Sequence, residues 1–264
     1  MKKLIDFTVV ENRRIHSDYA LLILAPASAG IDAADALGGI RPGQFVQVSS
    51  AAVPGVMLRR PISINRVEVE RGRLWLLVRN AGRATDHMMN LREGDTLNLL
   101  LPLGNGFTIP DDARSEVLLV GGGVGVAPLL QLGVELDRRG FKPQFLLGAR
   151  SKADLLELDL FEAVGDVYCS TDDGSYGAPG FAAANPVLTQ KHFDMIYCCG
   201  PTPMMKSIAA VARGIGASCE VSLENMMACG LGACLCCVEK TVKGNVCVCT
   251  EGPVFNIDQL SWQI

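Results

Sequence analysis

Four cysteines in the C-terminal part of the chain have the number and the spacing needed to hold iron through sulfur. A flat two-iron cluster needs two thiolates on each iron, and a C-x₄-C-x₂-C loop followed by a fourth cysteine is typical of a [2Fe–2S] site. Gly230 and Gly232 let such a loop curl, because glycine accepts positive φ and brings backbone N–H groups close to the sulfurs. The candidate ligands are Cys229, Cys234, Cys237 and Cys249.

Two other uses of cysteine compete with this interpretation. Zinc also takes four cysteines, although structural zinc sites usually pair two short knuckles, and a disulfide framework belongs to oxidising compartments. The choice of ligands is also open, because Cys236 adjoins Cys237 and Cys247 lies two residues before Cys249. A strand over residues 246–249 would point the last two cysteines to one face, so periodicity does not choose between them.

The composition is that of a globular protein with a sizeable core. The 264 residues are enough for two domains, and 49% of them are hydrophobic. The net charge of −4 gives no reason to expect nucleic acid or an anionic membrane as a partner. Because there are ten cysteines and the first residues lack the apolar core of a signal peptide, we expect a cytoplasmic protein that uses cysteine for metal or redox chemistry.

Residues 117–134 form an uncharged run that is long enough to resemble a membrane span. The run contains Pro128 and several glycines, which a strand, a glycine turn and a helix explain better than a membrane helix. We therefore expect no membrane segment.

Residues 4 to about 104 contain short apolar segments separated by turn signals. Candidate strands cover residues 7–11, 19–24, 44–48, 62–65 and 73–78. Many short strands with turns between them predict a small antiparallel β-barrel. One helix is expected to interrupt it from about Thr85 to Leu91, with Thr85 as its N-cap.

From about residue 116 the pattern changes to strands that alternate with helices, which predicts a parallel α/β sheet. An apolar strand over 117–120 leads through a glycine-rich turn into a helix that ends near Gly140. A later helix is expected over 203–213, stopped by Gly214. Further strands are expected at 144–148, 166–170 and 195–199.

The glycine-rich turn lies where a phosphate could bind, since it follows a strand and opens a helix. Tight turns need glycine anyway, and the segment lacks the full G-x-G-x-x-G pattern with an acid about 20 residues on. The motif alone is therefore weak. Its glycines are Gly121, Gly122, Gly123 and Gly125.

Three shorter motifs could also contact a cofactor. Arg60 offers a guanidinium fork to a diphosphate, and Gly82 to Thr85 open a helix whose N-terminus suits the same group. A surface arginine and a simple helix cap are the plainer interpretations. The third motif follows an apolar strand at the sheet edge where α/β ligands bind, although an ordinary turn would look the same. It consists of Cys199, Gly200 and Pro201.

Taken in order, these motifs resemble the ferredoxin–NADP reductase superfamily over nearly the whole chain. The resemblance implies a flavin-binding β-barrel domain (1–111), a nicotinamide-binding parallel α/β domain (112–221) and a [2Fe–2S] segment (222–264). The run from Ser222 to Glu239 and the run Cys249-Thr-Glu-Gly-Pro-Val-Phe255 look like the electron-transfer subunits of type B dihydroorotate dehydrogenase. In that family the fourth ligand directly precedes the acidic-Gly-Pro-Val-Phe run, which implies Cys249, and the third ligand aligns with Cys237.

The same resemblance implies the cofactor contacts. Arg60 would neutralise the diphosphate of FAD, and Ser63 would lie near the flavin ring. Ile62 stands where many members have an aromatic residue, and Ala84 replaces a usual glycine. The implied FAD contacts are Arg60, Pro61, Ile62, Ser63, Leu77, Val78, Arg79, Gly82, Ala84 and Thr85. The implied nicotinamide contacts are Gly121, Gly122, Gly123, Gly125, Asp172, Cys199, Gly200 and Pro201.

NAD is expected rather than NADP. Members of the superfamily that use NADP hold its 2′-phosphate with a Ser-Arg pair, whereas the matching residues 170–174 contain Asp172 and Asp173 and no arginine. A carboxylate repels a phosphate and accepts a hydrogen bond from a ribose hydroxyl. A solvated acidic turn without a ligand is the alternative, and Arg150 is nearby in the sequence.

The implied function is electron transfer in pyrimidine (UMP) biosynthesis. Electrons would pass from the FMN of a catalytic dihydroorotate dehydrogenase subunit through the cluster and FAD to NAD⁺, in a heterotetramer of two catalytic and two electron-transfer subunits. Leu231 and Leu235 are expected at the subunit contact.

Two alternatives remain. One is the small subunit of another flavin and iron–sulfur complex, of the ferredoxin:NADP or sulfide dehydrogenase type, some of which have Asp in place of Cys229. The other is a zinc- and nucleotide-binding sensor without turnover.

Overall fold

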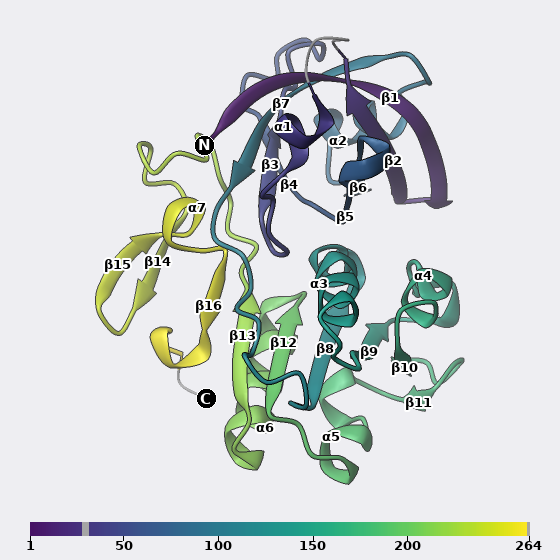
Figure 1. The fold of residues 1–264 in the computed structure, drawn as a ribbon, viewed down its shortest axis with the longest axis vertical. Helices are drawn as coiled ribbons and strands as arrows, with labels where there is room; N and C mark the ends of the chain where they lie inside the picture. The colour runs from purple at the N-terminus through teal and green to yellow at the C-terminus, as the bar shows by residue number, and fades with distance from the viewer. Residues whose placement is uncertain (28–31, 263–264) are drawn as a thin grey trace.

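The chain forms two sheets of seven strands, one above the other in Figure 1. The structure is a computed structural model that describes residues 1–27 and 32–262. The first sheet is antiparallel, with the strand order β4-β3-β7-β1-β2-β6-β5. Its strands are β1 (Lys3–His16), β2 (Tyr19–Pro26), β3 (Phe45–Val48), β4 (Arg60–Ser63), β5 (Arg66–Glu68), β6 (Arg73–Arg79) and β7 (Thr96–Leu103).

This first sheet closes into a barrel because its two edge strands, β4 and β5, are consecutive in the chain. Ile64 N donates to Gln44 O (3.1 Å) on one side, and Asn65 N donates to Trp75 O (3.0 Å) on the other. The chain therefore passes directly from one edge strand of the sheet to the other, which brings the two edges of the barrel together. The predicted antiparallel barrel is confirmed. It also carries α1 (Ala33–Leu37), η1 (Val69–Arg71) and α2 (Arg83–Met89).

The second sheet has the order β11-β10-β9-β8-β12-β13-β16 and is parallel except for its last pair. Its central strands are buried on both faces, which is why they read as continuous apolar runs. The strands are β8 (Val117–Gly122), β9 (Gln144–Ala149), β10 (Asp166–Thr171), β11 (Ala178–Pro179), β12 (Met195–Cys199), β13 (Ser218–Ser222) and β16 (Val254–Asn256). The connections are η2 (Gly123–Val126), α3 (Ala127–Arg138), η3 (Lys152–Asp154), α4 (Leu158–Glu162), η4 (Ala182–Ala184), α5 (Val187–Gln190) and α6 (Thr202–Ile215).

The cysteine-rich segment, yellow-green to yellow in Figure 1, runs along one side of both domains. It contains a two-stranded hairpin and a short helix before it adds β16 to the second sheet, antiparallel to β13. The segment thus becomes part of the second domain at its far end. Its elements are β14 (Val238–Thr241), β15 (Gly244–Cys247), α7 (Val248–Glu251), β16 and η5 (Ile257–Gln259).

Asn65 joins the barrel to the second domain by forming hydrogen bonds with backbone groups of α3. Its side-chain Nδ2 donates to Ala127 O (3.4 Å), while its backbone oxygen accepts from Gln131 N (3.1 Å). Gln131 Oε1 in turn accepts from Val67 N (2.8 Å). These bonds fix β5 against α3, which lies between the barrel and the sheet (Figure 1).

Three local predictions were wrong. The barrel helix begins at Arg83 with Gly82 as its N-cap, and Thr85 lies inside the first turn, where its hydroxyl donates to Gly82 O (2.9 Å). Helix α6 continues through Gly214, because its left-handed terminator is Gly216. The strand expected over 246–249 ends at Cys247, where α7 begins.

None of the described helices is long and apolar enough to cross a membrane.

Candidate functional site

The glycine-rich turn and the Cys-Gly-Pro turn meet at one edge of the second sheet. Their strands β8 and β12 are parallel neighbours, with Gly121 paired to Cys199, so both end at the same edge. A Cβ added to Gly125 would lie 2.5 Å from Cys199 O, and one added to Gly122 would lie 2.7 Å from Met204 Sδ. Gly122 and Gly125 therefore allow these turns to pack closely at the edge where α/β ligands bind.

A carboxylate at this edge connects the second domain with the barrel. Glu224 follows β13, and its Oε1 lies 4.0 Å from Cys199 Sγ. The surrounding protein raises the pKa of the Glu224 carboxyl although part of the side chain is open to solvent, and the charge of Arg79 at the end of β6 opposes that rise. Burial, helped by the charge of Glu224, also raises the pKa of the Cys199 thiol well above its usual range. The Cys199 thiol thus lies beside the Glu224 carboxyl, and the charge of Arg79 from the barrel acts on that carboxyl.

The FAD motifs predicted in the barrel lie on adjoining elements. β4 carries the residues from Arg60 to Ser63 and lies next to β6, whose end carries Leu77 to Arg79. Helix α2 begins after β6, so its free N-terminal N–H groups lie beside the same strand. The guanidinium of Arg60 donates to Leu58 O (2.9 Å) and is only half-buried.

Asp172 lies in the exposed turn that follows β10. The neighbouring Asp173 accepts from Ser175 N (2.9 Å) and Ser175 Oγ (2.6 Å), and these bonds lower the pKa of its carboxyl. Arg150 pairs with Asp154 (3.3 Å), so its guanidinium does not neutralise the turn. Asp173 thus shapes the turn, and the carboxylate of Asp172 remains exposed.

Backbone N–H groups point at three of the four predicted cluster ligands. Leu231 N donates to Cys229 Sγ (3.3 Å), Gly232 N to Cys249 Sγ (3.2 Å) and Cys249 N to Cys237 Sγ (3.4 Å). The loop makes these bonds with positive φ at Gly230, Gly232 and Leu235, of 69°, 81° and 57°. Such N–H to sulfur bonds stabilise thiolates, as an iron–sulfur site requires.

The other two cysteines of the segment are placed differently. The Cys247 thiol donates to Gly232 O (3.8 Å), and Cys236 is exposed, as is the predicted ligand Cys234. Burial disfavours ionisation of Cys229, but N–H donors from Leu231, Cys234 and Ala233 outweigh it and lower the pKa of the Cys229 thiol to about 6.

The donor set fits a two-iron cluster. Cys229 interacts with Cys234, and Cys249 interacts with Cys237 and Cys229, while Cys247 lies close to the same thiols. A [2Fe–2S] cluster requires only two thiolates on each iron, whereas a four-cysteine zinc site requires four at one point.

The cysteine loop is held against the barrel. A Cβ on Gly230 would lie 2.9 Å from Gln47 Cγ, and Gln47 is the cross-strand partner of Pro61 in the predicted FAD motif. Asn105 Nδ2 donates to Thr250 O (3.1 Å) and to Glu251 O (2.9 Å), at the end of α7. The residues next to Cys229 are therefore one strand away from β4.

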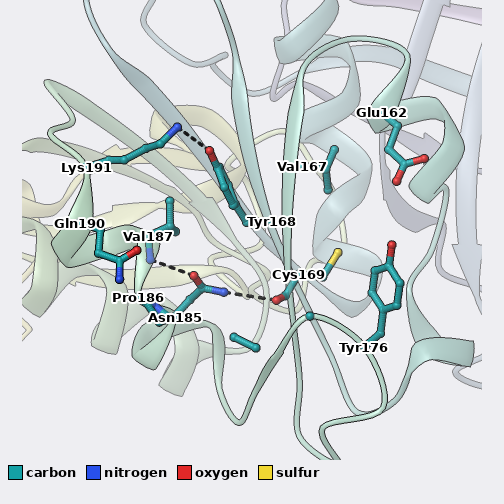
Figure 2. A pocket seen from close by; sticks show the side chains of 12 residues that line it. Glu162, Val167, Tyr168, Cys169, Tyr176, Asn185, Pro186, Val187, Gln190 and Lys191 are labelled. Carbon is teal, nitrogen blue, oxygen red and sulfur yellow. Dashed lines mark hydrogen bonds between the residues drawn. The ribbon is translucent and has the colours of Figure 1, made fainter.

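The pocket in Figure 2 lies away from these motifs. It has a volume of about 460 Å³, and none of the predicted site residues lines it. Its polar groups bond one another: Lys191 Nζ donates to Tyr168, and Asn185 Nδ2 donates to Cys169 O (3.2 Å). A second groove of about 890 Å³ lies between the barrel and α3, and none of the predicted site residues lines it either.

The sequence analysis missed three residues that the structure places beside the motifs. Glu224 had a signal, since it follows a strand of the sheet and precedes Cys229 by five residues. Gln47 and Asn105 had no signal in the sequence, because each contacts residues that lie more than 140 positions later in the chain.

The fold and the site define a flavin- and nicotinamide-dependent reductase with an added iron–sulfur segment. Residues 224–261 match the iron-sulfur cluster binding domain of dihydroorotate dehydrogenase B. The chain is 40% identical to the dihydroorotate dehydrogenase B (NAD(+)) electron transfer subunit of Shouchella clausii, over 83% of this chain and 86% of that one. It is 38% identical to the subunit of the same name from Fusobacterium nucleatum, over 81% and 84%. The chain belongs to the family of dihydroorotate dehydrogenase B electron transfer subunits.

Solved structures agree with this assignment. A chain from the structure of an NADH-dependent reduced ferredoxin-NADP oxidoreductase superposes with a TM-score of 0.84 and 30% identity, covering 97% of this chain and 90% of that one. The cytochrome b5 reductase domain of Ulva prolifera nitrate reductase, at 18% identity and a TM-score of 0.65, shares the fold over 81% and 93%. The predicted fold class and family are confirmed.

Proposed function

We propose that this chain carries electrons from the FMN of a catalytic dihydroorotate dehydrogenase subunit through a [2Fe–2S] cluster and FAD to NAD⁺, in pyrimidine biosynthesis. When bound, the cluster would supply single electrons, and FAD would collect two of them and pass a hydride to NAD⁺. The observation that carries the proposal is adjacency: Gly230 of the cysteine loop packs on Gln47, whose strand pairs with the FAD motif at Pro61. Neighbouring strands are about 4.8 Å apart, so cluster and flavin sites adjoin.

The barrel supplies the FAD site. Arg60 and the N–H groups of Arg83, Ala84 and Thr85 offer positive charge to the two ends of a diphosphate. Ser63 and the residues from Leu77 to Arg79 border the space for the flavin ring. Ile62 and Ala84 differ from the residues that many superfamily members have at these positions. The proposed diphosphate contacts do not depend on either side chain, because neither supplies positive charge.

The second domain supplies the NAD site. At the edge formed by the residues around Gly121 and Cys199, Glu224 contacts Cys199, and the charge of Arg79 from the barrel acts on Glu224. A nicotinamide held at this edge, over Gly200 and Pro201, would meet a flavin held by the barrel. The exposed carboxylate of Asp172 suits a ribose hydroxyl rather than a 2′-phosphate.

Cys229, Cys234, Cys237 and Cys249 are the proposed ligands of the cluster. Three of these sulfurs accept backbone N–H bonds, whereas the Cys247 thiol donates. The three functional units are then residues 1–111, 112–221 and 222–264.

The proposed assembly pairs two of these chains with two catalytic subunits. The loop around Cys229 presents apolar side chains to solvent, and Leu231 and Leu235 are 48% and 64% exposed. A partner that covered them would also bring its flavin close to the cluster. All ten cysteines are free, which suits a reducing cytoplasm.

The test uses the chain alone and with the catalytic partner. The isolated chain should contain iron, sulfide and FAD, and should oxidise NADH with artificial dyes but not act on dihydroorotate. With the partner, it should co-elute and reduce NAD⁺ with dihydroorotate. Dihydroorotate turnover by the isolated chain would contradict the proposal.

A second candidate is the small subunit of another flavin and iron–sulfur complex. The likeness to the chain of the NADH-dependent ferredoxin-NADP oxidoreductase structure favours it. Ferredoxin reduction that persists without any dihydroorotate activity in the complex would select it. A colourless protein that binds zinc would instead select the sensor.

A further inference from the structure

Gln47 of β3 is a buried side chain with no hydrogen-bond partner. It is completely buried, and both Nε2 and Oε1 lack a partner within the described part of the protein. Its backbone oxygen is satisfied, accepting from Arg59 Nη1 (3.1 Å). Leaving a buried amide unpaired costs about 1–3 kcal/mol per group, and such groups nearly always have a partner. The side chain therefore has no partner among the described residues and could donate to a bound group beside it.

The direction of the Gln47 side chain follows from the strand. Val46 and Val48 belong to the core inside the barrel, so Phe45 and Gln47 point outward. Phe45 packs in the same apolar cluster as Cys237 and Cys249. Gln47 therefore lies on the face of the barrel that carries the cysteine segment.

Gly230 is the residue that lies over the Gln47 amide. A Cβ at Gly230 would be 2.9 Å from Gln47 Cγ and 3.2 Å from Nε2, so only glycine leaves the amide in its present position. Gly230 directly follows Cys229, whose sulfur already accepts an N–H bond from Leu231 (3.3 Å). The unpaired amide thus lies beside the Cys229 end of the sulfur site.

We propose that Gln47 is a positioning residue for the iron–sulfur site, whose side-chain N–H donates to a sulfur of the cluster beside Cys229. This inference rests on the cluster proposed above. A bond from a neutral donor to a charged acceptor is stronger than one between neutral groups. Because reduction adds negative charge to the sulfurs, the donor favours the reduced state and raises the reduction potential.

The experiment replaces Gln47 by Leu in the complete chain loaded with iron and FAD. An electron-spin-resonance titration measures the potential of the cluster, and pulsed measurements in H₂O and D₂O detect exchangeable protons near it. Gln47→Leu should lower the equilibrium constant for reduction by up to about tenfold, which is 59 mV for one electron. It should also remove one exchangeable proton coupling.

Gln44 provides a matched control in the same strand region. It is also buried, but its amide is satisfied: Nε2 donates to Gly104 O (2.7 Å), and Oε1 accepts from Arg41 N (2.8 Å). Gln44→Leu should therefore lower the melting temperature and leave the cluster potential unchanged.

Three results would overturn the inference. If the unpaired amide has no role, Gln47→Leu should raise the melting temperature and leave the cluster potential and the proton couplings unchanged. A shift in flavin absorbance or FAD affinity alone would assign the amide to the flavin. If Gln47→Leu does not take up iron, Gln47→Met, which is similar in length and lacks the N–H donor, should show the lower potential, and an unchanged potential there would also overturn the inference. Absence of iron from the unaltered chain would instead refute the proposed function.

Discussion

Cys247 and Cys249 lie close together but make opposite hydrogen bonds. Cys249 Sγ accepts from Gly232 N, whereas Cys247 Sγ donates to Gly232 O. We therefore expect Cys249→Ser to lose the cluster and Cys247→Ser to keep it, as measured by iron and sulfide content. The exposed Cys236 is the control, since Cys236→Ser should also keep its iron. Loss of iron from Cys247→Ser alone would reverse the ligand assignment.

Asp172 is the residue expected to set the choice of nicotinamide cofactor. Removing its carboxylate removes a charge that repels a 2′-phosphate, so Asp172→Ala should raise the ratio of kcat/KM for NADPH over NADH by about tenfold, or 1.4 kcal/mol. Asp173→Ala should instead loosen the turn and weaken both cofactors, because Asp173 holds Ser175. Equal use of NADH and NADPH by the unaltered chain would refute this prediction.

At the scale of elements, the contact between the barrel and α3 contains a glutamate, Glu157, whose surroundings disfavour its ionised form. Glu157 is buried, and its Oε2 accepts from Asn65 Nδ2 (2.8 Å), but its Oε1 and Asn65 Oδ1 have no partner in the described chain. Burial raises the pKa of Glu157 to about 7; the charge of Asp159 adds to the rise, and the Asn65 bond and Arg13 oppose it.

The sign of the resulting pH dependence follows from linkage. The folded state holds the Glu157 proton more tightly than the unfolded state, so this group stabilises the fold below its ordinary pKa and loses that contribution as pH rises to about 7. Glu157→Gln should remove this slope and raise stability at pH 8 by up to roughly 3 kcal/mol. Urea unfolding at several pH values measures it, with the exposed Glu162→Gln as control. An unchanged slope in Glu157→Gln would contradict the assignment.

Many of the strands and the two sheet types were predictable, while the strand order and the ends of elements were not. Period-two alternation and continuous apolar runs are local properties, and they gave the barrel and the parallel sheet correctly. Gly214 was taken as a helix terminator, but a glycine ends a helix only where the backbone turns left-handed, which happens at Gly216. Likewise, Val248 and Cys249 read as a strand, yet tertiary contacts place them in α7.

The candidate site was predictable where a motif is contiguous. The cysteine spacing, the turn at Cys199 and the motif at Arg60 each lie within a few residues. Gln47, Asn105 and the approach of Glu224 to Arg79 depend on chain segments that meet only in the folded molecule. Such contacts leave no periodic or compositional trace in a single sequence.

At the scale of the whole molecule, the exposed apolar loop should be the contact with the catalytic subunit. Leu231→Asp or Leu235→Asp should weaken co-elution with that subunit by at least about tenfold, because a buried unpaired charge is costly. NADH oxidation with dyes should remain, since neither residue touches the predicted FAD or NAD motifs. Val242, 63% exposed on the β14–β15 turn, is the matched control, and Val242→Asp should not affect binding. Co-elution that survives both leucine changes would place the contact elsewhere.

Asn105 and Gln47 hold the cysteine loop from the other end of the sequence, and this determines when iron can enter. The loop follows the barrel in the chain, and its supports come from the barrel and from the connection that follows it. Before the barrel has folded, the four thiols are only neighbours along a chain; afterwards they line a site of fixed shape. We therefore expect iron insertion to follow the folding of the barrel.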